Sequence, residues 1–445
     1  MLKRIKEISQ KFLEQTKEKK VIIISHYDTD GITSASIMAS VLKKIDRNFS
    51  IKIVKQLEQE IIEKLPKNKI LVFLDLGSGN IEQINKLKND IYILDHHEIK
   101  KIRVGKNINI INPHLSEEED LCGACLTYLF AKEIDKDNKD LANLAIIGMV
   151  GDMMEKNIGK IGNSIINDAE IIIKKGILFY PATRPLHKAL EFSSSMYIPG
   201  VTGSSTGAIN LLRDAGIYKK DGKYKSLMEL NDDEMSRLLT AILLKRNKRE
   251  TEDLVGYIYL VKFSNRLEDA RELSAIINAC SRMGNSNIAL TLCMGNKESR
   301  KKAEKIYAEY KQHLIEGLSL VSNIKKIEGD NYVIINAKNS IKDTIIGTIA
   351  TIIAVSSVYK KGTAIITMAY NGNKIKVSGR IAGRRINGRN ENSKNIREIL
   401  ESVVKETGGE IGGHDVAAGC LISRAKEKEF IAALEKKLNF ELIKV

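Results

Sequence analysis

The sequence predicts an α/β protein made of two α/β domains joined by helices. Two observations support this fold class. Three short, apolar, β-branched runs alternate with helix-like sequence near the start of the chain, and a second series of this kind begins near residue 332. Nearly continuous apolar runs of this length are typical of parallel strands that are buried on both faces. A chain of 445 residues is also long enough for two or three domains.

The first domain is expected to begin with a helix over residues 1–20 and to continue as a parallel sheet. The three expected strands are residues 21–24, 70–74 and 91–94. Sequence with helical spacing separates and follows these strands, at residues 34–45, 81–87, 121–132 and 141–150. We place this parallel-sheet domain at residues 1–225.

The middle of the chain, residues 226–328, is expected to be a helical insert and connector. Its pattern is helical and more charged than that of the flanking domains. Within a long helix expected over residues 298–318, Ile306, Tyr310 and Leu314 lie at four-residue steps and form one apolar stripe.

A smaller α/β domain is expected at residues 329–445. Its expected strands are residues 332–336, 362–370 and 374–378. Its expected helices are residues 344–358, 395–407 and 426–438.

The composition favours partners that carry phosphate and excludes a secreted or membrane protein. Lysine and arginine outnumber the acids 71 to 56, for a net charge of +15, which fits binding to phosphate polymers. The alternative is a surface that is simply rich in lysine. No apolar run approaches the roughly 18–20 residues of a membrane span, and the first residues lack a signal peptide's apolar stretch. The five scattered cysteines are typical of free thiols, so we expect a cytoplasmic protein.

Acids and histidines follow each of the three expected strands. They are His26, Asp28 and Asp30 after the first strand, Asp75 after the second, and Asp95, His96 and His97 after the third. The carboxyl ends of neighbouring parallel strands share one crevice, the usual ligand site of an open α/β sheet. Asp152, directly after the apolar helix over residues 141–150, is a further candidate. Taken singly, these acids could equally be helix caps, turn residues or loop acids.

This concentration of ionisable groups favours a metal centre. Burying many carboxylates and histidines together without a counter-charge is very unfavourable. A pair of divalent cations removes that penalty, and Asp and His suit Mn²⁺, Mg²⁺ or Zn²⁺. Three of the chain's seven histidines lie in these motifs, and adjacent histidines at a strand end have no routine packing role.

The ordered motifs resemble those of the DHH phosphoesterase superfamily. The similar pieces are His26-Tyr27-Asp28-Thr29-Asp30-Gly31, Asp75, Asp95-His96-His97 and Gly151-Asp152. Gly412-Gly413-His414 resembles the signature of the DHH-associated domain that follows in this family. The matches extend from residue 21 to residue 420, which is nearly the whole chain. The resemblance implies an N-terminal DHH domain and a C-terminal DHH-associated domain that binds nucleic acid.

Within this superfamily the chain looks most like the archaeal RecJ-like single-strand nucleases. His26 lies two residues before Asp28, as in RecJ-type motifs, and Ser378-Gly379-Arg380 resembles the Ser-x-Arg motif of RecJ. The resemblance implies a metal-dependent exonuclease that hydrolyses single-stranded DNA or RNA to mononucleotides, in DNA replication, repair or RNA processing. It leaves open the polarity of digestion and the preference for DNA or RNA.

The resemblance also implies roles for the acids and histidines. One ion would be held by His26, Asp28 and Asp75, and the other by Asp30, Asp75, His96 and Asp152, with Asp75 as the bridge. Two ions per site are expected, and Mn²⁺ is favoured over Mg²⁺ because mixed His and carboxylate ligands suit it better. His97 is expected to meet charge that develops on the phosphate. Asp95 is expected to fix the orientation of a histidine, although a strand-end cap is the alternative.

The C-terminal domain is expected to hold the substrate. Gly412 and Gly413 let backbone N–H groups approach a phosphate, and His414, Ser378 and Arg380 are expected to contact the nucleic acid. The stretch from Arg380 to Arg397 adds a basic run, made of Arg380, Arg384, Arg385, Arg389, Lys394 and Arg397 against Glu391 alone. The alternatives are a plain Gly-Gly-His loop and a solvated basic loop.

Cys122 and Cys125 form a single C-x-x-C pair, which could be half of a zinc site or a redox pair. No second pair follows at zinc-finger spacing. Both cysteines fall at the start of an expected helix, among small residues that could pack beneath the metal site, so we favour structural packing.

Two other functions are weighed against the exonuclease. One is a phosphodiesterase or phosphatase for very short RNAs, nucleoside bisphosphates or cyclic dinucleotides. The other is a replisome partner of the GINS complex, a role known among archaeal RecJ relatives. Every metal ligand that the resemblance implies is present, which argues against a purely structural role.

Overall fold

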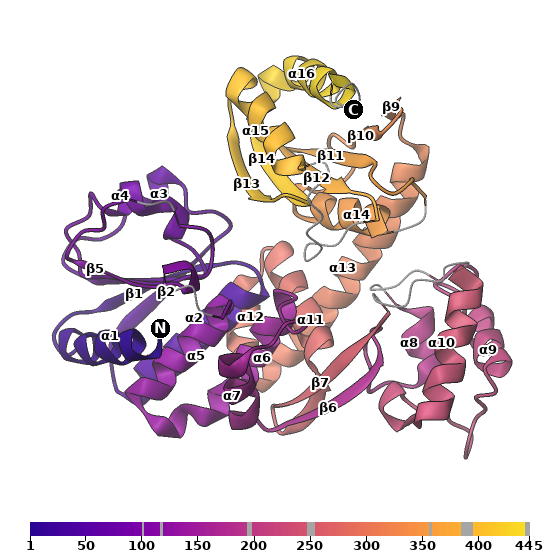
Figure 1. Cartoon of the computed structure of the whole chain (residues 1–445), viewed down its shortest axis with the longest axis horizontal. Helices are drawn as coiled ribbons and strands as arrows, with labels where there is room; N and C mark the ends of the chain where they lie inside the picture. The colour runs from indigo at the N-terminus through magenta and orange to yellow at the C-terminus, as the bar shows by residue number, and fades with distance from the viewer. Residues whose placement is uncertain are drawn as a thin grey trace. The chain divides into compact units, whose positions relative to one another are not determined.

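The structure is a computed structural model of the chain. It describes residues 1–99, 102–115, 119–193, 198–246, 254–355, 358–383 and 395–440. The chain divides into two compact units, Met1–Tyr307 and Ala308–Val445 (Figure 1). Across the described ranges, no helix is both long enough and apolar enough to cross a membrane.

A parallel sheet is the core of the first unit. Its strands are β1 (Val21–His26), β2 (Phe49–Val54), β3 (Ile70–Leu74), β4 (Ile91–Leu94) and β5 (Ile108–Ile111). They lie in the order β2-β1-β3-β4-β5, and every neighbouring pair is parallel. The predicted strands β1, β3 and β4 are confirmed and occupy the centre. The sequence does not predict the edge strands, because β2 alternates half-buried and exposed residues instead of forming a continuous apolar run.

Helices cover both faces of this sheet. The longer ones are α1 (Leu2–Gln15), α2 (Thr29–Lys44), α5 (Gly123–Ile134) and α6 (Ala142–Gly151). Among these, α1, α2 and α5 lie on one face, and α6 packs on α2 and α5. The short helices α3 (Gln59–Glu63) and α4 (Ile81–Ile84) lie on the other face (Figure 1), and α7 (Lys160–Asp168) packs on α5 and α6.

Helix α2 begins five residues before the predicted range, and the reason bears on the site. The Asp28 carboxylate accepts a hydrogen bond from the Gly31 N–H and so caps the helix. The cap starts α2 at Thr29 and brings Asp30 into its first turn. The capping role that the sequence left open for Asp28 is therefore present.

A three-stranded antiparallel sheet follows in the same unit. It contains β6 (Ile171–Ile177), β7 (Val255–Phe263) and β8 (Arg266–Asp269). Three helices lie between β6 and β7, namely α8 (Leu186–Glu191), α9 (Ser205–Asp214) and α10 (Asp232–Arg246). After β8 come α11 (Ala270–Arg282), α12 (Ser286–Cys293) and α13 (Lys297–Asn323), the last of which continues into the second unit.

The expected helical connector contains α10, α11, α12 and α13, and β7 and β8 also lie inside it. The sequence does not predict β7, because its partner β6 is distant in the sequence and its apolar run alone does not distinguish a strand from a helix. One apolar core joins α8, α9 and α10 and contains residues from both sides of the boundary predicted after residue 225, such as Leu212 and Leu227. The predicted domain boundaries themselves stay predictions.

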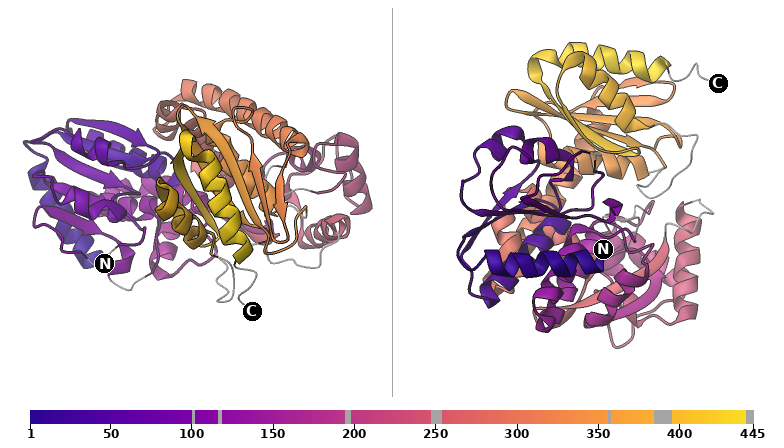
Figure 2. Two further views of the ribbon diagram at one scale, coloured as in Figure 1. Left: turned by 90° about the horizontal axis from the view of Figure 1, so that it is seen from above. Right: turned by 60° about the vertical axis from the view of Figure 1, so that its left-hand side comes forward.

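The second unit is built on a mixed sheet in the order β13-β14-β12-β11-β10-β9. Its strands are β9 (Ile327–Gly329), β10 (Tyr332–Asn336), β11 (Ala364–Asn371), β12 (Lys374–Ile381), β13 (Glu410–His414) and β14 (Ala417–Ser423). Helices α15 (Ile396–Thr407) and α16 (Glu427–Phe440) cover one face, and α14 (Asp343–Val355) packs on the other (Figure 2). The predicted α/β pattern is confirmed here, with β9, β13 and β14 added.

Candidate active site

The predicted site residues meet at the carboxyl end of the central strands. His26 is the last residue of β1, Asp75 follows β3, and Asp95 follows β4. Because β3 lies between β1 and β4 and all three are parallel, the residues that follow them share one edge of the sheet. Two further acids come from helices on this side: Asp30 from the first turn of α2, and Asp152 from the C-cap of α6.

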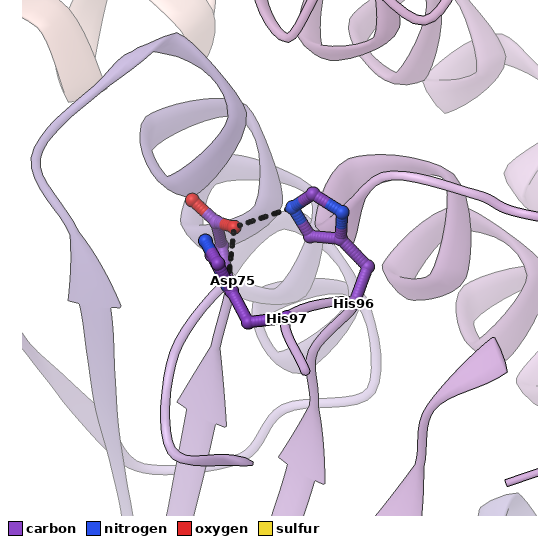
Figure 3. Close-up of side chains that lie close together, drawn as sticks. All are labelled: Asp75, His96 and His97. Carbon is purple, nitrogen blue, oxygen red and sulfur yellow. Dashed lines mark ion pairs between the residues drawn. The ribbon is translucent and has the colours of Figure 1, made fainter. Parts of the chain in front are cut away.

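Asp75 lies at the centre of the cluster. Its side chain is only 2% exposed, with Oδ1 at 3.3 Å from His96 Nε2 and Oδ2 at 3.3 Å from His26 Nδ1. Oδ1 also lies 3.9 Å from His97 Nδ1 (Figure 3). The backbone places the carboxylate there, since Asp75 adopts a left-handed conformation with φ of 56° and donates its N–H to the Leu94 carbonyl.

His26, Asp28 and Asp75 form one group of possible metal ligands, and Asp75, His96 and His97 form another. In the first group His26 Nδ1 lies 3.0 Å from Asp28 Oδ2, while the other oxygen of Asp28 caps α2. Asp75 belongs to both groups, which is the position expected of a bridging ligand. The individual ligand roles stay predictions.

Asp30 and Asp152 lie slightly farther from the histidines. Asp152 Oδ2 is 3.6 Å from His96 Nε2, and Asp30 Oδ2 is 3.9 Å from the same atom. Both oxygens of Asp30 also accept hydrogen bonds from the N-terminus of α5, at 2.7 Å from the Gly123 N–H and 2.8 Å from the Ala124 N–H. A carboxylate at a helix N-terminus is stabilised by the partial positive charge there, so Asp30 also fixes α5 against α2.

Asp95 holds His97 in place. The Asp95 Oδ1 atom lies 2.7 Å from His97 Nδ1 and accepts the His96 N–H, and Oδ2 accepts the Ser78 N–H at 2.8 Å. Burial lowers the pKa of His97, but the contact with Asp95 outweighs this effect and raises the pKa to about 9. Asp95 is thus placed to orient a histidine, as the sequence predicts, and it also anchors the turn after β4.

The acids of the cluster differ in their affinity for a proton. Burial, reinforced by the charge of Asp75, raises the pKa of Asp30 well above its usual value and that of Asp152 to about 7. Burial also acts to raise the pKa of Asp75, but the imidazoles of His26 and His96 outweigh it and hold this pKa well below its usual value. The surroundings therefore favour the charged form of Asp75 but disfavour the charged forms of Asp30 and Asp152.

The residues present fit a divalent cation. His26 Nδ1 and Asp75 Oδ2 are buried, lie 3.3 Å apart and have no hydrogen-bond partner within the described part of the chain. Buried polar atoms are normally hydrogen-bonded, so an imidazole nitrogen and a carboxylate oxygen that lie within ion-pair distance without a hydrogen bond fit two donors that share a cation. Imidazole nitrogen and carboxylate oxygen together suit Mn²⁺, and Asp28 Oδ2 beside His26 adds a third donor.

Small residues allow this close approach. A Cβ atom on Gly123 would lie 2.8 Å from Asp75 Cβ and 2.9 Å from Asp30 Oδ2, and one on Gly148 would lie 2.9 Å from Asp30 Oδ1. The neighbouring Cys122 and Cys125 are buried and form no disulfide, in keeping with the packing role, which stays a prediction. The sequence predicts small residues beneath the site, but its local pattern does not single out these glycines.

The predicted substrate contacts lie in the second unit, on three adjacent strands. In the sheet register, Ser378 of β12 pairs with Gly419 of β14, which pairs with Gly412 of β13. Two residues farther along β12, Arg380 pairs with Ala417, which pairs with His414. Gly413 lies between Gly412 and His414 and pairs with Ala418. The strands therefore bring these distant motif residues together at the end of one sheet.

Arg380 is held firmly within this unit. Its Nε donates to Thr351 Oγ1 at 2.9 Å and its Nη1 to the Gly379 carbonyl at 2.8 Å. The His414 side chain and residues Arg384, Arg385, Arg389, Glu391 and Lys394 of the basic run lie outside the described residues. Their predicted roles, like those of Ser378, Gly412 and Gly413, stay predictions.

Known families match three parts of the chain. The DHH family, N-terminal domain, matches residues 20–149, the DHH-CID domain matches residues 178–253, and the DHHA1 domain matches residues 320–439. An uncharacterized protein of Methanocaldococcus jannaschii is 32% identical over 99% of this chain and 100% of its own length. The putative SPbeta prophage-derived single-strand DNA-specific exonuclease YorK of Bacillus subtilis is 30% identical, over 40% of this chain and 32% of its own length.

Solved structures share the fold at low sequence identity. RecJ from Thermus thermophilus, in complex with Mn²⁺, is 16% identical with a TM-score of 0.60, over 98% of this chain and 54% of that one. The same protein was also solved with Mg²⁺. CDC45 from Entamoeba histolytica is 15% identical with a TM-score of 0.67, over 98% and 99% of the two chains. The chain spans only about half of Thermus RecJ and a third of the putative exonuclease YorK.

Proposed function

The chain belongs to the DHH family of phosphoesterases and has a RecJ-like fold, and from this premise we propose that it is a metal-dependent exonuclease acting on single-stranded DNA or RNA. The observation that carries the proposal is a buried cluster of acids and histidines in which His26 Nδ1 and Asp75 Oδ2 lie 3.3 Å apart and form no hydrogen bond. A relative described as a putative single-strand DNA-specific exonuclease supports the choice of substrate.

The proposal assigns a role to each side chain in the cluster. His26, Asp28 and Asp75 would hold one ion, and Asp30, Asp75, His96 and Asp152 would hold the other. Asp75 is common to both proposed sets, and it also lies close to His26 and Asp28 on one side and to His96 and His97 on the other. Mn²⁺ is the proposed metal, with Mg²⁺ as the alternative, since mixed nitrogen and oxygen donors favour Mn²⁺.

The chemistry divides between the metal and the chain. Bound divalent cations supply positive charge that makes water more acidic and offsets negative charge on a phosphodiester. His97, held through Nδ1 by Asp95, keeps a fixed orientation from which its ring can donate a hydrogen bond to a phosphoryl oxygen. The contact with Asp95 raises the pKa of His97 and so favours a ring that can donate this hydrogen bond. Hydrolysis of the terminal phosphodiester bond, one nucleotide at a time, would then release mononucleotides.

The second unit is proposed to hold the strand through its phosphates. Gly412 has open space beside it, so the sugar-phosphate backbone of a nucleic acid could approach it closely. Ser378 and Arg380 lie on β12 of the same sheet. Contacts of this kind follow the sugar-phosphate backbone, so binding is expected to depend weakly on sequence and strongly on salt.

Two other functions remain as outcomes of the test. A phosphodiesterase for very short RNAs, nucleoside bisphosphates or cyclic dinucleotides would use the same metal cluster. A replication partner of the GINS complex would need no metal chemistry, and the fold shared with CDC45 is the observation in its favour. The intact set of acids and histidines favours an enzyme over this last alternative.

The test is product mapping with Mn²⁺ on single strands of about 20 nucleotides, labelled at the 5′ or the 3′ end, as DNA and as RNA. Adenosine 3′,5′-bisphosphate is assayed in parallel. Stepwise release of mononucleotides from one labelled end supports the proposal and gives the polarity. Turnover of the bisphosphate with intact strands contradicts it in favour of the small-substrate enzyme, and no turnover of any substrate favours the replication partner.

A further inference from the structure

Helix α11 lies outside the motifs that carry the metal ligands but packs against both helices that present them. It contacts α2, which begins at the predicted ligands Asp28 and Asp30, and α6, which ends at Asp152. The other predicted ligands follow strands of the sheet, whose ladders fix them. The ligands on α2 and α6 lie outside these ladders. The contacts that hold these two helix ends, including those of Asp30 with the start of α5, therefore determine where three of the carboxylates lie.

At the start of α2, three hydrogen bonds join Thr29 to α11. The Thr29 N–H donates to Asn278 Oδ1 at 3.1 Å, and Thr29 Oγ1 donates to the Ser274 carbonyl at 2.9 Å. The Ser274 hydroxyl in turn donates to Thr29 Oγ1 at 3.1 Å. Thr29 is almost completely buried and lies between two predicted ligands, so these bonds fix the backbone from which both carboxylates extend.

Asn278 also leaves one carboxylate oxygen of Asp28 available to bind a cation. The first N–H groups of a helix have no partner within the helix and need an acceptor from outside. Asp28 Oδ1 accepts the Gly31 N–H, and Asn278 accepts the Thr29 N–H. Asp28 Oδ2 therefore stays 3.0 Å from His26 Nδ1 and available to a cation. Without Asn278, the buried Thr29 N–H would lack an acceptor and would compete for Asp28.

At the end of α6, a second contact from α11 holds the turn that carries Asp152. Arg271 Nη2 donates to Glu155 Oε1 at 2.8 Å, and Arg271 Nη1 donates to the Tyr257 carbonyl at 2.9 Å. Both side chains of this ion pair are mostly buried. The turn contains Met153 in a left-handed conformation, with φ of 59°, and this ion pair helps to keep the turn in place.

We propose that α11 is part of the metal site, with Asn278 as the positioning residue for Asp28 and Asp30, and Arg271, through Glu155, as the positioning residue for Asp152. This inference rests on the proposed function, because it presumes that these acids bind metal. Neither residue is assigned to the reacting atoms. Their effect is to reduce the freedom of the ligands, as partners of metal ligands do in other metal sites.

The test measures the affinity of the metal-stripped protein for Mn²⁺, from the electron paramagnetic resonance signal of unbound Mn²⁺, in the wild type, Asn278→Leu and Arg271→Gln. Each variant is expected to weaken binding by roughly 10-fold or more, the lower end of the range for outer partners of metal ligands. Glu155→Gln is expected to behave as Arg271→Gln does, and it supplies a further variant should Asn278→Leu fail to fold.

Matched controls remove similar contacts elsewhere in the same unit. Asn89 bonds the Pro66 and Lys69 carbonyls before β4, at the opposite end of the sheet, and Arg237 of α10 bonds the Ala215 and Gly216 carbonyls and pairs with Asp233. Asn89→Leu and Arg237→Gln are expected to lower the melting temperature but leave the Mn²⁺ affinity unchanged. Wild-type affinity in folded Asn278→Leu and Arg271→Gln would overturn the inference. Failure of the wild type to bind Mn²⁺ would instead overturn the proposed function.

Discussion

Asp75 combines an unusual backbone conformation with a central place among the predicted ligands. Its φ of 56° is a left-handed value that Asp and Asn tolerate better than most residues, because their short polar side chains can bond locally. Replacing it by Ala would therefore change the backbone as well as the charge. Asn keeps the conformation and the size and removes only the charge.

We predict that Asp75→Asn abolishes Mn²⁺-dependent hydrolysis with little change in stability. The loss of the shared anionic ligand should lower the rate by more than the roughly 100-fold that loss of an outer partner can cost. The rate with excess Mn²⁺ and the midpoint of urea unfolding check this expectation. Activity within a few-fold of wild type would show that Asp75 is not a ligand.

His97 and Asp95 give a second prediction, which concerns orientation. Asp95→Asn keeps the size of the side chain but loses the charge that holds His97 Nδ1 at 2.7 Å. If His97 stabilises developing charge, His97→Gln should lower kcat by about 100- to 1000-fold, with a smaller effect on KM. Asp95→Asn should lower kcat less than His97→Gln does. Steady-state kinetics on a labelled strand separate the two parameters, and an effect on KM alone would contradict the assignment.

The grouping of the site residues was predictable from the sequence, but the hydrogen bonds that hold them in place were not. His26, Asp75 and His96 follow apolar runs, and parallel strands bring such positions to one edge whatever the rest of the fold does. The bonds from Asp30 to Gly123 and from Thr29 to Asn278 join segments roughly 90 and 250 residues apart. No local pattern in one sequence encodes such pairs, because they depend on how helices pack.

The start of α5 packs directly on two of the predicted ligands, which gives a prediction for this helix. Gly123→Ala would place a methyl group 2.8 Å from Asp75 Cβ and would push α5 away from Asp30. We expect a loss of about 1–3 kcal/mol in the free energy of unfolding and weaker Mn²⁺ binding. Gly79→Ala is the matched control, because a methyl group there meets nothing within 4 Å. Urea unfolding and Mn²⁺ titration of both variants check this expectation. It would be contradicted if Gly123→Ala and Gly79→Ala had the same free energy of unfolding and the same Mn²⁺ affinity.

Helices α5 and α7 are joined by an acid whose effect should depend on pH. Asp168, at the end of α7, accepts a hydrogen bond from Tyr128 at 2.9 Å and pairs with Lys132, both from α5. Burial acts to raise the pKa of Asp168, but the contacts with Lys132 and Tyr128 outweigh it and lower the pKa. A lowered pKa stabilises the folded state above the ordinary Asp value, and this contribution disappears as the pH falls through the folded value.

Asp168→Asn should therefore destabilise the protein at pH 7 by about 1–2 kcal/mol, a modest loss because the lysine is partly exposed. The difference from wild type should shrink as the pH falls below about 4. Urea unfolding at several pH values measures it. A difference that stays constant down to pH 2 would mean that the charge of Asp168 does not contribute.

The elements themselves were predictable to the extent that their patterns are local. Strands β1, β3 and β4 are built on short apolar runs, and α14 and α15 have clear helical spacing. Two of the strands that the sequence does not predict show the limits of local patterns. β2 is a half-exposed edge strand, and β7 pairs with β6 across about 80 residues, so its apolar run is compatible with a helix until the partner is known.

For the whole molecule, a net charge of +15 predicts that binding to single strands weakens as salt rises. Arg380→Gln should weaken binding to every sequence and reduce the slope of log affinity against log salt by about 0.7, the value for one phosphate contact on a single strand. Lys405→Gln, on the helix that covers the opposite face of the sheet, removes the same charge and should leave the slope unchanged. Fluorescence anisotropy at several salt concentrations measures both, and equal slopes would contradict a phosphate contact at Arg380.

The most direct test of the proposed metal centre is to add Mn²⁺ back to the metal-stripped protein, count the ions that bind to each chain and record their electron paramagnetic resonance spectrum. Two ions per chain are predicted, with the spin coupling expected of neighbours that share a ligand, and Asp75→Asn should lose the coupling. A single ion per chain, or two uncoupled ions that are indifferent to Asp75→Asn, would contradict the bridged pair on which the proposed hydrolysis depends.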